Sequence, residues 1–205
     1  KAVEKAQKKV EENHFASRKQ LLEYDQVNND QREIIYKERS MVLEGQDVHK
    51  EVTGMIRNVI DRKIQVAKKD GVLSVVELNR LLLPIIPVPS LSKKDVQKRG
   101  FEKKLFQEAI SLYEQKENLL EQMYPGQQVM REVERNILLR VVDANWMEQI
   151  NAMEQLRQGI HMVSYGQKDP KVEYRVRGFQ MFDLMNENIQ EETVKLLYQV
   201  DPVTS

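Results

Sequence analysis

Hydrophobic residues recur at steps of three and four along most of this chain, the spacing that gathers side chains on one face of an α-helix. Residues 1–43 contain neither Pro nor Gly and consist mainly of good helix formers. The pairs Glu4/Lys8 and Glu33/Lys37 are each four residues apart, so they support a helix from its exposed face. The pattern therefore predicts one long helix over residues 1–43.

The first half of this predicted helix is poor in large apolar residues, of which Val3, Val10 and Phe15 are the main ones. A helix so long and polar has no core of its own, so we expect it to serve as a scaffold that lies along other elements. A coiled-coil arm is the alternative. Against it, the apolar positions do not keep a strict a/d register over several heptads.

Residues 46–126 form a second region, in which shorter helical segments alternate with breaks. Over about Asp47–Lys69 the apolar residues again follow the helical spacing, and Asp70-Gly71 is expected to end this helix. Ser74-Val75-Val76-Glu77 has the form of a capping box, in which the Ser side chain accepts a hydrogen bond from the first turn of a helix. A short helix is therefore predicted before Pro84.

Three prolines follow in Pro84–Pro89, and each disfavours helix in the residue before it, so this segment is predicted to be an extended loop. Ser92-Lys93-Lys94-Asp95 is a second cap-like start, and the helix that it opens is expected to run to Tyr124. Pro125-Gly126 then breaks the chain.

From Gln127 onward the pattern predicts two amphipathic helices joined by a short loop at 164–169. Asp169-Pro170 suits the start of the second helix, because Asp caps free N–H groups and Pro fits the first helical position. The two apolar stripes are expected to pack against each other and against the long N-terminal helix. The first comprises Met130, Val133, Ile137, Val141, Ala144 and Met147, widened by Trp146, Ile150, Met153 and Ile160, and the second comprises Val172, Val176, Phe179, Phe182, Ile189, Leu196 and Val200.

Composition narrows the function classes. The chain has 32 basic and 32 acidic residues, so its charge gives no reason to expect nucleic-acid binding. It has no Cys, which excludes disulfides and thiolate chemistry and fits a reducing cytosol. No apolar run approaches the ~20 residues that span a bilayer. The chain begins at Lys1 within a helical pattern and without a visible signal peptide, so we expect a fragment of a larger protein.

No constellation for bond-making chemistry is apparent. None of the eight glycines is followed by Lys, so no phosphate-binding G-x-x-x-x-G-K-[ST] loop is present. His14, His49 and His161 lie far apart, and none is paired with another His at metal-ligand spacing. We therefore expect no catalytic residue, no metal site and no cofactor within this chain.

Two separate parts of the sequence closely resemble the SecA family, the motor ATPases of bacterial preprotein translocation. Segments of the C-terminal part resemble the family's two-helix finger, and segments of the N-terminal part resemble the start of its long scaffold helix. The former are Leu138-Leu139-Arg140-Val141-Val142-Asp143, Trp146-Met147-Glu148, Ala152-Met153-Glu154-Gln155-Leu156-Arg157-Gln158-Gly159-Ile160-His161, Tyr165-Gly166-Gln167-Lys168-Asp169-Pro170 and Glu173-Tyr174; the latter are Glu4-Lys5-Ala6-Gln7-Lys8-Lys9-Val10-Glu11, Phe15, Arg18-Lys19-Gln20-Leu21-Leu22-Glu23-Tyr24-Asp25 and Asn29-Asp30-Gln31-Arg32.

The resemblance implies an all-α fold: a long scaffold helix (1–45), a small inserted helical wing domain (46–126), and an antiparallel two-helix finger with the end of the scaffold (127–205). It implies a module that couples ATP hydrolysis in absent motor domains, which would hold ATP and Mg²⁺, to pushing unfolded preproteins through a SecYEG-type channel. The implied partners are that channel, preprotein chains and the protein's own motor domains. The implied location is cytoplasmic, peripheral on the cytoplasmic face of the bacterial plasma membrane, with either a monomer or a homodimer left open.

Tyr165 is the residue on which we expect the finger to depend. The resemblance implies that the aromatic residue of the fingertip enters the mouth of the SecY channel and contacts the translocating polypeptide, with Gly166, Gln167 and Lys168 beside it. An aromatic ring suits this contact, because it grips varied side chains while its OH tolerates water. The alternative is a turn Tyr that packs back on its own hairpin.

Other residues carry weaker expectations. The resemblance places Arg18 and Asp25 against the motor as coupling residues; the alternative is two exposed charges on a solvated helix. Lys168 and three cations beyond it form either a solvated face or a contact with an acidic channel rim or lipid headgroups. Those three are Lys171, Arg175 and Arg177.

Two residues of the first finger helix concern packing. Trp146 is expected in the core of the hairpin, with a platform for a ligand as the alternative. Gly159 costs about 1 kcal/mol relative to Ala within a helix, and close approach of another helix would explain that cost.

Two hypotheses of function remain at this point. The first is the scaffold, wing and finger part of a SecA-type translocase, a mechanical and binding module. The second is a free-standing helical structural or adaptor protein without an ATPase partner. A phosphate-binding loop encoded upstream of Lys1 in the same polypeptide would decide between them.

Overall fold

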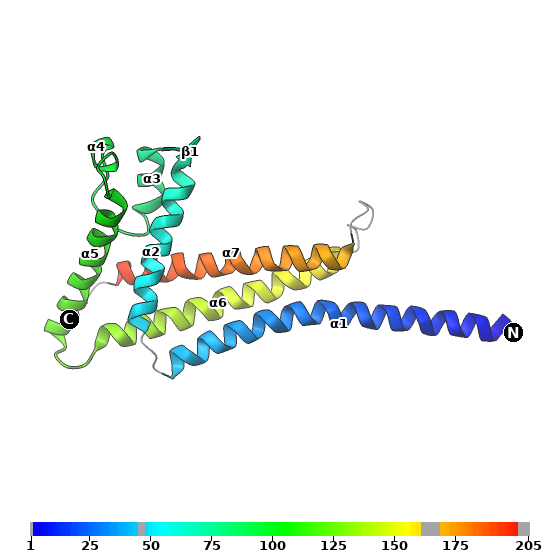
Figure 1. The fold of residues 1–205 in the computed structure, drawn as a ribbon. Coiled ribbons are helices and arrows are strands. Elements are labelled where there is room, and N and C mark those ends of the chain that lie inside the picture. Colours follow the sequence, from blue (N-terminus) through cyan, green and yellow to red (C-terminus); the bar gives the residue numbers. More distant parts are fainter. Residues whose placement is uncertain (1, 45–47, 161–168, 201–205) are drawn as a thin grey trace. The chain divides into compact units, whose positions relative to one another are not determined.

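The computed structural model describes residues 2–44, 48–160 and 169–200, with the backbone alone at residues 2, 13, 16, 17 and 20. Helices dominate these residues, which confirms the predicted all-α class (Figure 1). The elements are α1 (Ala2–Leu43), α2 (Val48–Ala67), β1 (Lys68–Lys69), β2 (Val72–Leu73), α3 (Val75–Leu82), α4 (Lys93–Val96), α5 (Phe101–Met123), α6 (Val129–Gly159) and α7 (Pro170–Gln199).

The end of α2 differs from the expectation, because a two-stranded hairpin follows the helix directly. Lys68 pairs with Leu73 and Lys69 with Val72 in a small antiparallel hairpin. Asp70 and Gly71 form its turn with φ of 50° and 78°. Two consecutive positive φ values are typical of the two-residue turns that join twisted strands, and Asp-Gly is among the pairs that adopt them most readily.

The predicted start of α3 is confirmed, since the Ser74 side chain accepts a hydrogen bond from the N–H of Glu77 at 3.4 Å. The proline-rich segment that follows is non-helical, as predicted, but it begins as a turn. There the N–H groups of Ile85 and Ile86 both donate to the Leu82 carbonyl, at 3.0 and 2.9 Å. Both Ile side chains are buried, so this loop forms part of the core of its region.

The prediction of one helix from Ser92 to Tyr124 is wrong in one respect. Ser92 and Asp95 form a complete capping box, but α4 spans only Lys93–Val96, and a new helix starts at Phe101. Gly100 between them has a φ of 79°, a left-handed conformation that glycine adopts without steric cost. This conformation interrupts the helical pattern and starts α5 as a separate helix.

The chain divides into two compact units. Unit 1 comprises Lys1–Glu38 and Trp146–Met185, and unit 2 comprises Arg39–Asn145 and Asn186–Ser205. Within unit 1, α6 and α7 run side by side in opposite directions (Figure 1). Its core holds Tyr24 and Val27 of α1, Met153 and Ile160 of α6, and Tyr174 of α7.

In unit 2, α2 packs against both α3 and α5. Lys63 of α2 also pairs with Glu191 of α7 at 2.6 Å, and Asn145 of α6 donates to Glu192 of α7 at 3.0 Å. The core of this unit consists mostly of branched aliphatic side chains. It includes Val52, Ile56, Val59, Ile60 and Ile64 of α2, Leu78 and Leu82 of α3, Leu105 and Ala109 of α5, and Leu138 and Val141 of α6.

Several residues of the predicted apolar stripes are exposed instead of packed between the helices. Trp146, Met153, Ile160, Phe182 and Ile189 are buried as expected. Three polar residues of these two helices are buried as well: Glu134 and Gln149 of α6 and Thr193 of α7. The exposed positions are Ala144, Met147, Ile150, Val172, Val176 and Phe179.

Candidate functional site

The predicted fingertip, Tyr165, Gly166, Gln167 and Lys168, lies outside the described residues, so its role stays a prediction. The structure does describe the base of the hairpin on either side. Asp169 accepts a hydrogen bond from the N–H of Lys171 at 2.9 Å, and α7 starts at Pro170. This confirms the predicted capped start of the second finger helix.

The base of the hairpin is packed against α1 by aromatic side chains. The rings of Tyr24 and Tyr174 lie 4.5 Å apart at an angle of 50°, and both residues are buried. The Tyr174 hydroxyl donates to Asn28 at 3.1 Å. Ile160, the last described residue before the tip, is buried in the same cluster. The two helices that lead to the tip are therefore anchored on the long helix.

A glycine permits this close packing, but it is Gly178 and not Gly159. A Cβ at Gly178 would lie 3.0 Å from Cε of Met153 and 3.3 Å from Cγ1 of Val27. A Cβ at Gly159 would meet nothing within 4 Å, so the expected close approach there is wrong. Residues from α1, α6 and α7 thus meet at Gly178.

Two buried glutamines join the same three helices. Gln149 of α6 donates from Nε2 to Oε1 of Gln31 on α1 at 3.0 Å. Gln31 in turn donates from Nε2 to the carbonyl of Gly178 on α7, also at 3.0 Å. A buried amide that forms such a chain holds its neighbours in one register, because a slip would leave its polar groups unpaired.

Arg18 and Asp25, the predicted coupling residues, are both exposed on α1. No hydrogen bond or ion pair between their side chains occurs in the described part of the chain. Asp25 influences a residue of α6. The pKa of the Arg157 guanidinium is raised, chiefly by its hydrogen bond to Glu154 and further by the charges of Glu154 and Asp25. The structure thus brings Asp25 near a charged residue of α6.

Of the three described cations beyond the tip, Lys171, Arg175 and Arg177, two are engaged in ion pairs. Lys171 pairs with Glu23 of α1 at 2.8 Å, and this hydrogen bond is the first cause of its raised pKa. Arg177 pairs with Glu173 at 2.7 Å. Arg175 is exposed, and Lys168 lies outside the described residues. Pairing of two cations reduces the positive surplus at this end of the hairpin.

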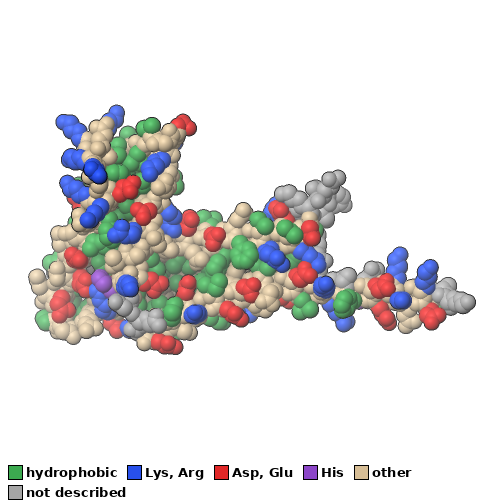
Figure 2. Space-filling model, viewed as in Figure 1, with side chains coloured by type: hydrophobic (Ala, Val, Ile, Leu, Met, Phe, Trp, Pro, Cys, Tyr) green, Lys and Arg blue, Asp and Glu red, His purple; other side chains and the backbone are tan. Residues whose placement is uncertain are grey.

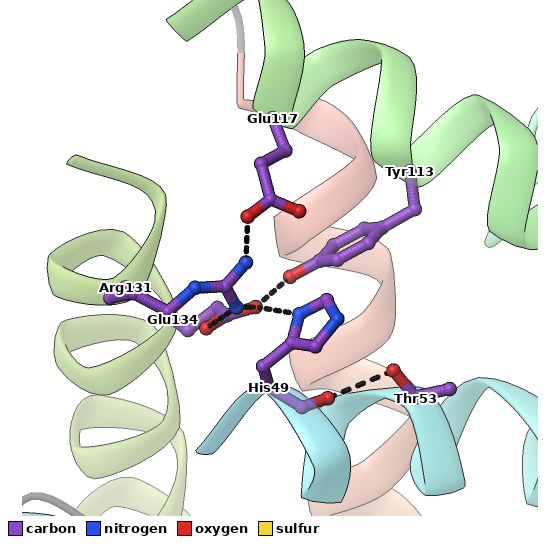
Figure 3. A network of polar contacts seen from close by, with 6 residues as sticks. All are labelled: His49, Thr53, Tyr113, Glu117, Arg131 and Glu134. Atoms are coloured by element: carbon purple, nitrogen blue, oxygen red, sulfur yellow. Dashed lines mark hydrogen bonds and ion pairs between the residues drawn. The ribbon is translucent and has the colours of Figure 1, made fainter. Parts of the chain in front are cut away.

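Unit 2 contains a buried polar cluster that the sequence analysis missed, here called the Glu134 network (Figure 3). It consists of His49 of α2, Tyr113 and Glu117 of α5, and Arg131 and Glu134 of α6. The Glu134 side chain is fully buried, with 0% exposure. It accepts a hydrogen bond from the Tyr113 hydroxyl and others from Nη1 of Arg131 at 2.5 Å.

The remaining contacts complete this network. Nδ1 of His49 lies 3.2 Å from the Glu134 carboxylate, and its ring stacks on that of Tyr113 at 5.9 Å. Arg131 also donates from Nη2 to Glu117. All these partners converge on carboxylates and join α2, α5 and α6, so the network holds these three helices together.

Electrostatics within the network agree with its geometry. Burial raises the pKa of the Tyr113 hydroxyl, and the hydrogen bond to Glu134 raises it further. Burial by itself would lower the pKa of Arg131, but its hydrogen bonds to Glu117 and Glu134, together with the charges of these carboxylates, outweigh burial and raise that pKa. In the sequence, the one signal of this network was Glu134 itself. It is a charged residue four positions from both Met130 and Leu138, on the apolar side of a helix.

The described residues contain neither a metal-binding cluster nor a membrane-spanning helix. Among them, no group of three or more His, Asp or Glu side chains is placed to hold a metal ion. Within residues 2–44, 48–160 and 169–200, each helix is too short or too polar to span a bilayer.

Comparison with known proteins gives a consistent result. The model of the family described as the SecA Wing and Scaffold domain matches residues 1–201. The protein translocase subunit SecA of Lachnoclostridium phytofermentans is 46% identical over 204 residues, which cover 97% of this chain and 24% of that protein. The corresponding subunit of Finegoldia magna is 41% identical over 209 residues, or 99% of this chain and 22% of that protein.

A third relative, protein translocase subunit SecA 1 of Clostridioides difficile, is 41% identical over 206 residues, which cover 98% of this chain and 22% of that protein. The chain therefore spans about a quarter of the length of the curated relatives it matches.

Proposed function

Because the chain belongs to the SecA family and matches its wing and scaffold region, we propose that it is the coupling and finger module of a SecA-type protein translocase. ATP, with Mg²⁺, would be bound and hydrolysed by motor domains outside these residues. The module would transmit that work to an unfolded preprotein and push it through a SecYEG-type channel.

The observation that carries the proposal is the anchoring of the hairpin on α1. Tyr24 and Tyr174 pack together, the Gln149–Gln31–Gly178 chain is buried, and Lys171 pairs with Glu23. Two helices that share a core with a third can transmit a load, because displacing them from α1 would expose that core and unpair those groups. These contacts support a rigid lever and do not require chemistry at the tip.

The remaining assignments follow from this arrangement. Tyr165, with Gly166, Gln167 and Lys168, would contact the preprotein, and Arg18 and Asp25 would contact the motor domains from the exposed side of α1. The protein would act at the cytoplasmic face of the bacterial plasma membrane as a peripheral component of the channel complex.

A chimera tests the proposal. Residues 1–201 of this chain should replace the matching region of the Clostridioides difficile SecA 1 and preserve preprotein transport into vesicles that contain its channel. A second chimera that lacks 161–168 should keep its basal ATPase activity and lose transport, because the lever would have no tip. A first chimera that folds and hydrolyses ATP but moves no preprotein would refute the proposal, and so would full transport by the second.

A further inference from the structure

Unit 2 has a pocket of about 270 Å³ between the loop that follows Pro87, α4 and the first turns of α5. Its apolar wall includes Leu105, which is buried, and Leu91 and Phe101, which are half-buried. The loop side is held in place, because the backbone N–H and carbonyl of Leu91 both bond to the side-chain amide of Asn79 at 2.9 Å. The pocket is thus a formed feature with room for one bulky apolar side chain.

Cations surround this pocket. Residues 93–104 contain six cations and two carboxylates, a surplus of four in a chain of zero net charge. Figure 2 shows Lys and Arg side chains gathered over α4 and the start of α5. Lys98, Arg99 and Lys104 line the pocket itself, and all three are exposed.

Most of these cations have no ion-pair partner among the described residues. In the described parts of the chain, no ion pair involves Lys93, Lys94, Arg99, Lys103 or Lys104. Lys98 is the exception, since it pairs with Asp95 at 2.9 Å. Such a group of unpaired like charges raises the potential at the pocket and favours an anionic ligand.

Two carboxylates also line the pocket, and they differ in availability. Asp95 already accepts hydrogen bonds from Ser92 and Lys98, which hold its pKa well below the ordinary range. Glu108 forms no ion pair with the described residues, so it is the carboxylate that an incoming anion would meet. Removal of its charge should therefore strengthen the binding of an acidic ligand.

We propose that this pocket docks an acidic segment of a partner protein that inserts one large apolar side chain between carboxylates. The hollow form favours a peptide over a lipid surface, because a bilayer would touch protruding side chains and not a recessed Leu–Phe wall. A nucleic acid fits less well, since stacking needs exposed aromatic rings. The two aromatic residues of 66–108, Phe101 and Phe106, are both half-buried. The proposal uses unit 2 alone, so its failure would leave the proposed transport function untouched.

The test is a titration of the 205-residue chain with a fluorescent peptide of Asp and Glu residues around one central Phe. The chain should bind this peptide, and a peptide with Ala for Phe should bind about tenfold more weakly. Arg99→Glu with Lys104→Glu should weaken binding at least about tenfold, and Glu108→Gln should strengthen it. The matched control, Lys8→Glu with Lys9→Glu on the exposed part of α1, makes the same change of net charge and should shift affinity less than about twofold.

Each opposite result overturns the proposal. Absence of binding up to about 1 mM peptide excludes the site. Equal binding of the Ala peptide, or an equal loss in the α1 control, would mean attraction by charge alone. The chain is also tested with vesicles of equal parts phosphatidylglycerol and phosphatidylcholine and with single-stranded DNA. If one of these binds, the Arg99/Lys104 variant loses that binding and no peptide binds, the cluster belongs to that other class of partner.

Discussion

Glu134 is a fully buried carboxylate with partners on three helices of unit 2, and its removal should be costly. Glu134→Ala leaves Tyr113, Arg131 and His49 without their shared acceptor, so we expect a loss of about 3–5 kcal/mol in the free energy of unfolding. Urea unfolding, monitored by circular dichroism, measures this loss of free energy.

Glu132 provides a control for this substitution on the same helix. Its side chain is 62% exposed and pairs with Arg135 at 3.3 Å. Glu132→Ala should therefore change the free energy of unfolding by no more than about 0.5 kcal/mol. Equal effects of the two substitutions would show that the Glu134 network contributes nothing beyond ordinary surface charge.

Tyr165 belongs to a tip whose two helices are held by their own contacts below it. Tyr165→Ala should therefore leave the melting temperature nearly unchanged, while transport by a full-length SecA that carries this chain should fall strongly. Tyr165→Phe keeps the ring and should be milder, because most of the contact area of the side chain is aromatic. A Tyr packed into its own hairpin predicts the reverse, a clear stability loss in Tyr165→Ala with transport that fails only as folding fails.

At the scale of the helices, Gly178 allows α7 to lie close to α1 and α6. Gly178→Ala gains about 1 kcal/mol of helix propensity but crowds the stiff side chain of Val27 and the end of Met153. Crowding in a packed core costs about 1–3 kcal/mol, so the net change in the free energy of unfolding should be zero or a loss.

Gly159 offers the matched comparison, because a Cβ there meets nothing within 4 Å. Gly159→Ala should keep most of the propensity gain and stabilise the chain by up to about 1 kcal/mol. Thermal unfolding of both variants measures the difference. If Gly178→Ala proves as stabilising as Gly159→Ala, the three helices are not in close contact at that position.

The long helix α1 is expected to couple the finger to the motor through its exposed charges. Arg18→Ala or Asp25→Ala should leave the unfolding free energy of this chain within about 0.5 kcal/mol, since both side chains are exposed. In a full-length SecA with this region, each should alter the stimulation of ATPase activity by channel and preprotein. Lys19→Ala, on the same exposed turn, is the control. Unchanged stimulated rates in both variants would end the coupling role.

For the molecule as a whole, burial of tyrosines sets its response to alkaline pH. Burial raises the pKa of Tyr113, Tyr174 and Tyr198 above the ordinary value of about 10. A raised pKa in the folded state contributes stability that is fully present below the unfolded pKa and is lost as pH rises through the folded value. Stability should therefore decline above about pH 10.

Tyrosinate absorbance together with circular dichroism measures this decline. These three of the seven tyrosines should ionise only as helicity is lost. Ionisation of all seven near their ordinary pKa, with the helical signal intact, would contradict the buried positions of these rings.

The ends of the helices could be predicted from sequence, because caps and turns depend on residues a few positions apart. Ser74 and Ser92 cap helices as their motifs indicate, and α7 starts at Pro170. The hairpin after α2 and the break at Gly100 were exceptions. A glycine in a helical pattern is compatible with both a continuous helix and a left-handed turn, so the sequence pattern alone does not decide between them.

What the tertiary structure decided was which side of each helix is buried. Val172, Val176 and Phe179 fit the apolar periodicity of α7, yet all three are exposed. Gln31, Glu134 and Gln149 occupy buried positions instead, because another helix supplies a hydrogen-bonding partner to each. Burial of a polar side chain becomes favourable only when such a partner is present. The partners lie from 21 to 147 residues away, so they exist only once the chain has folded. Local sequence thus determined where helices form, and their three-dimensional neighbours determined which faces meet.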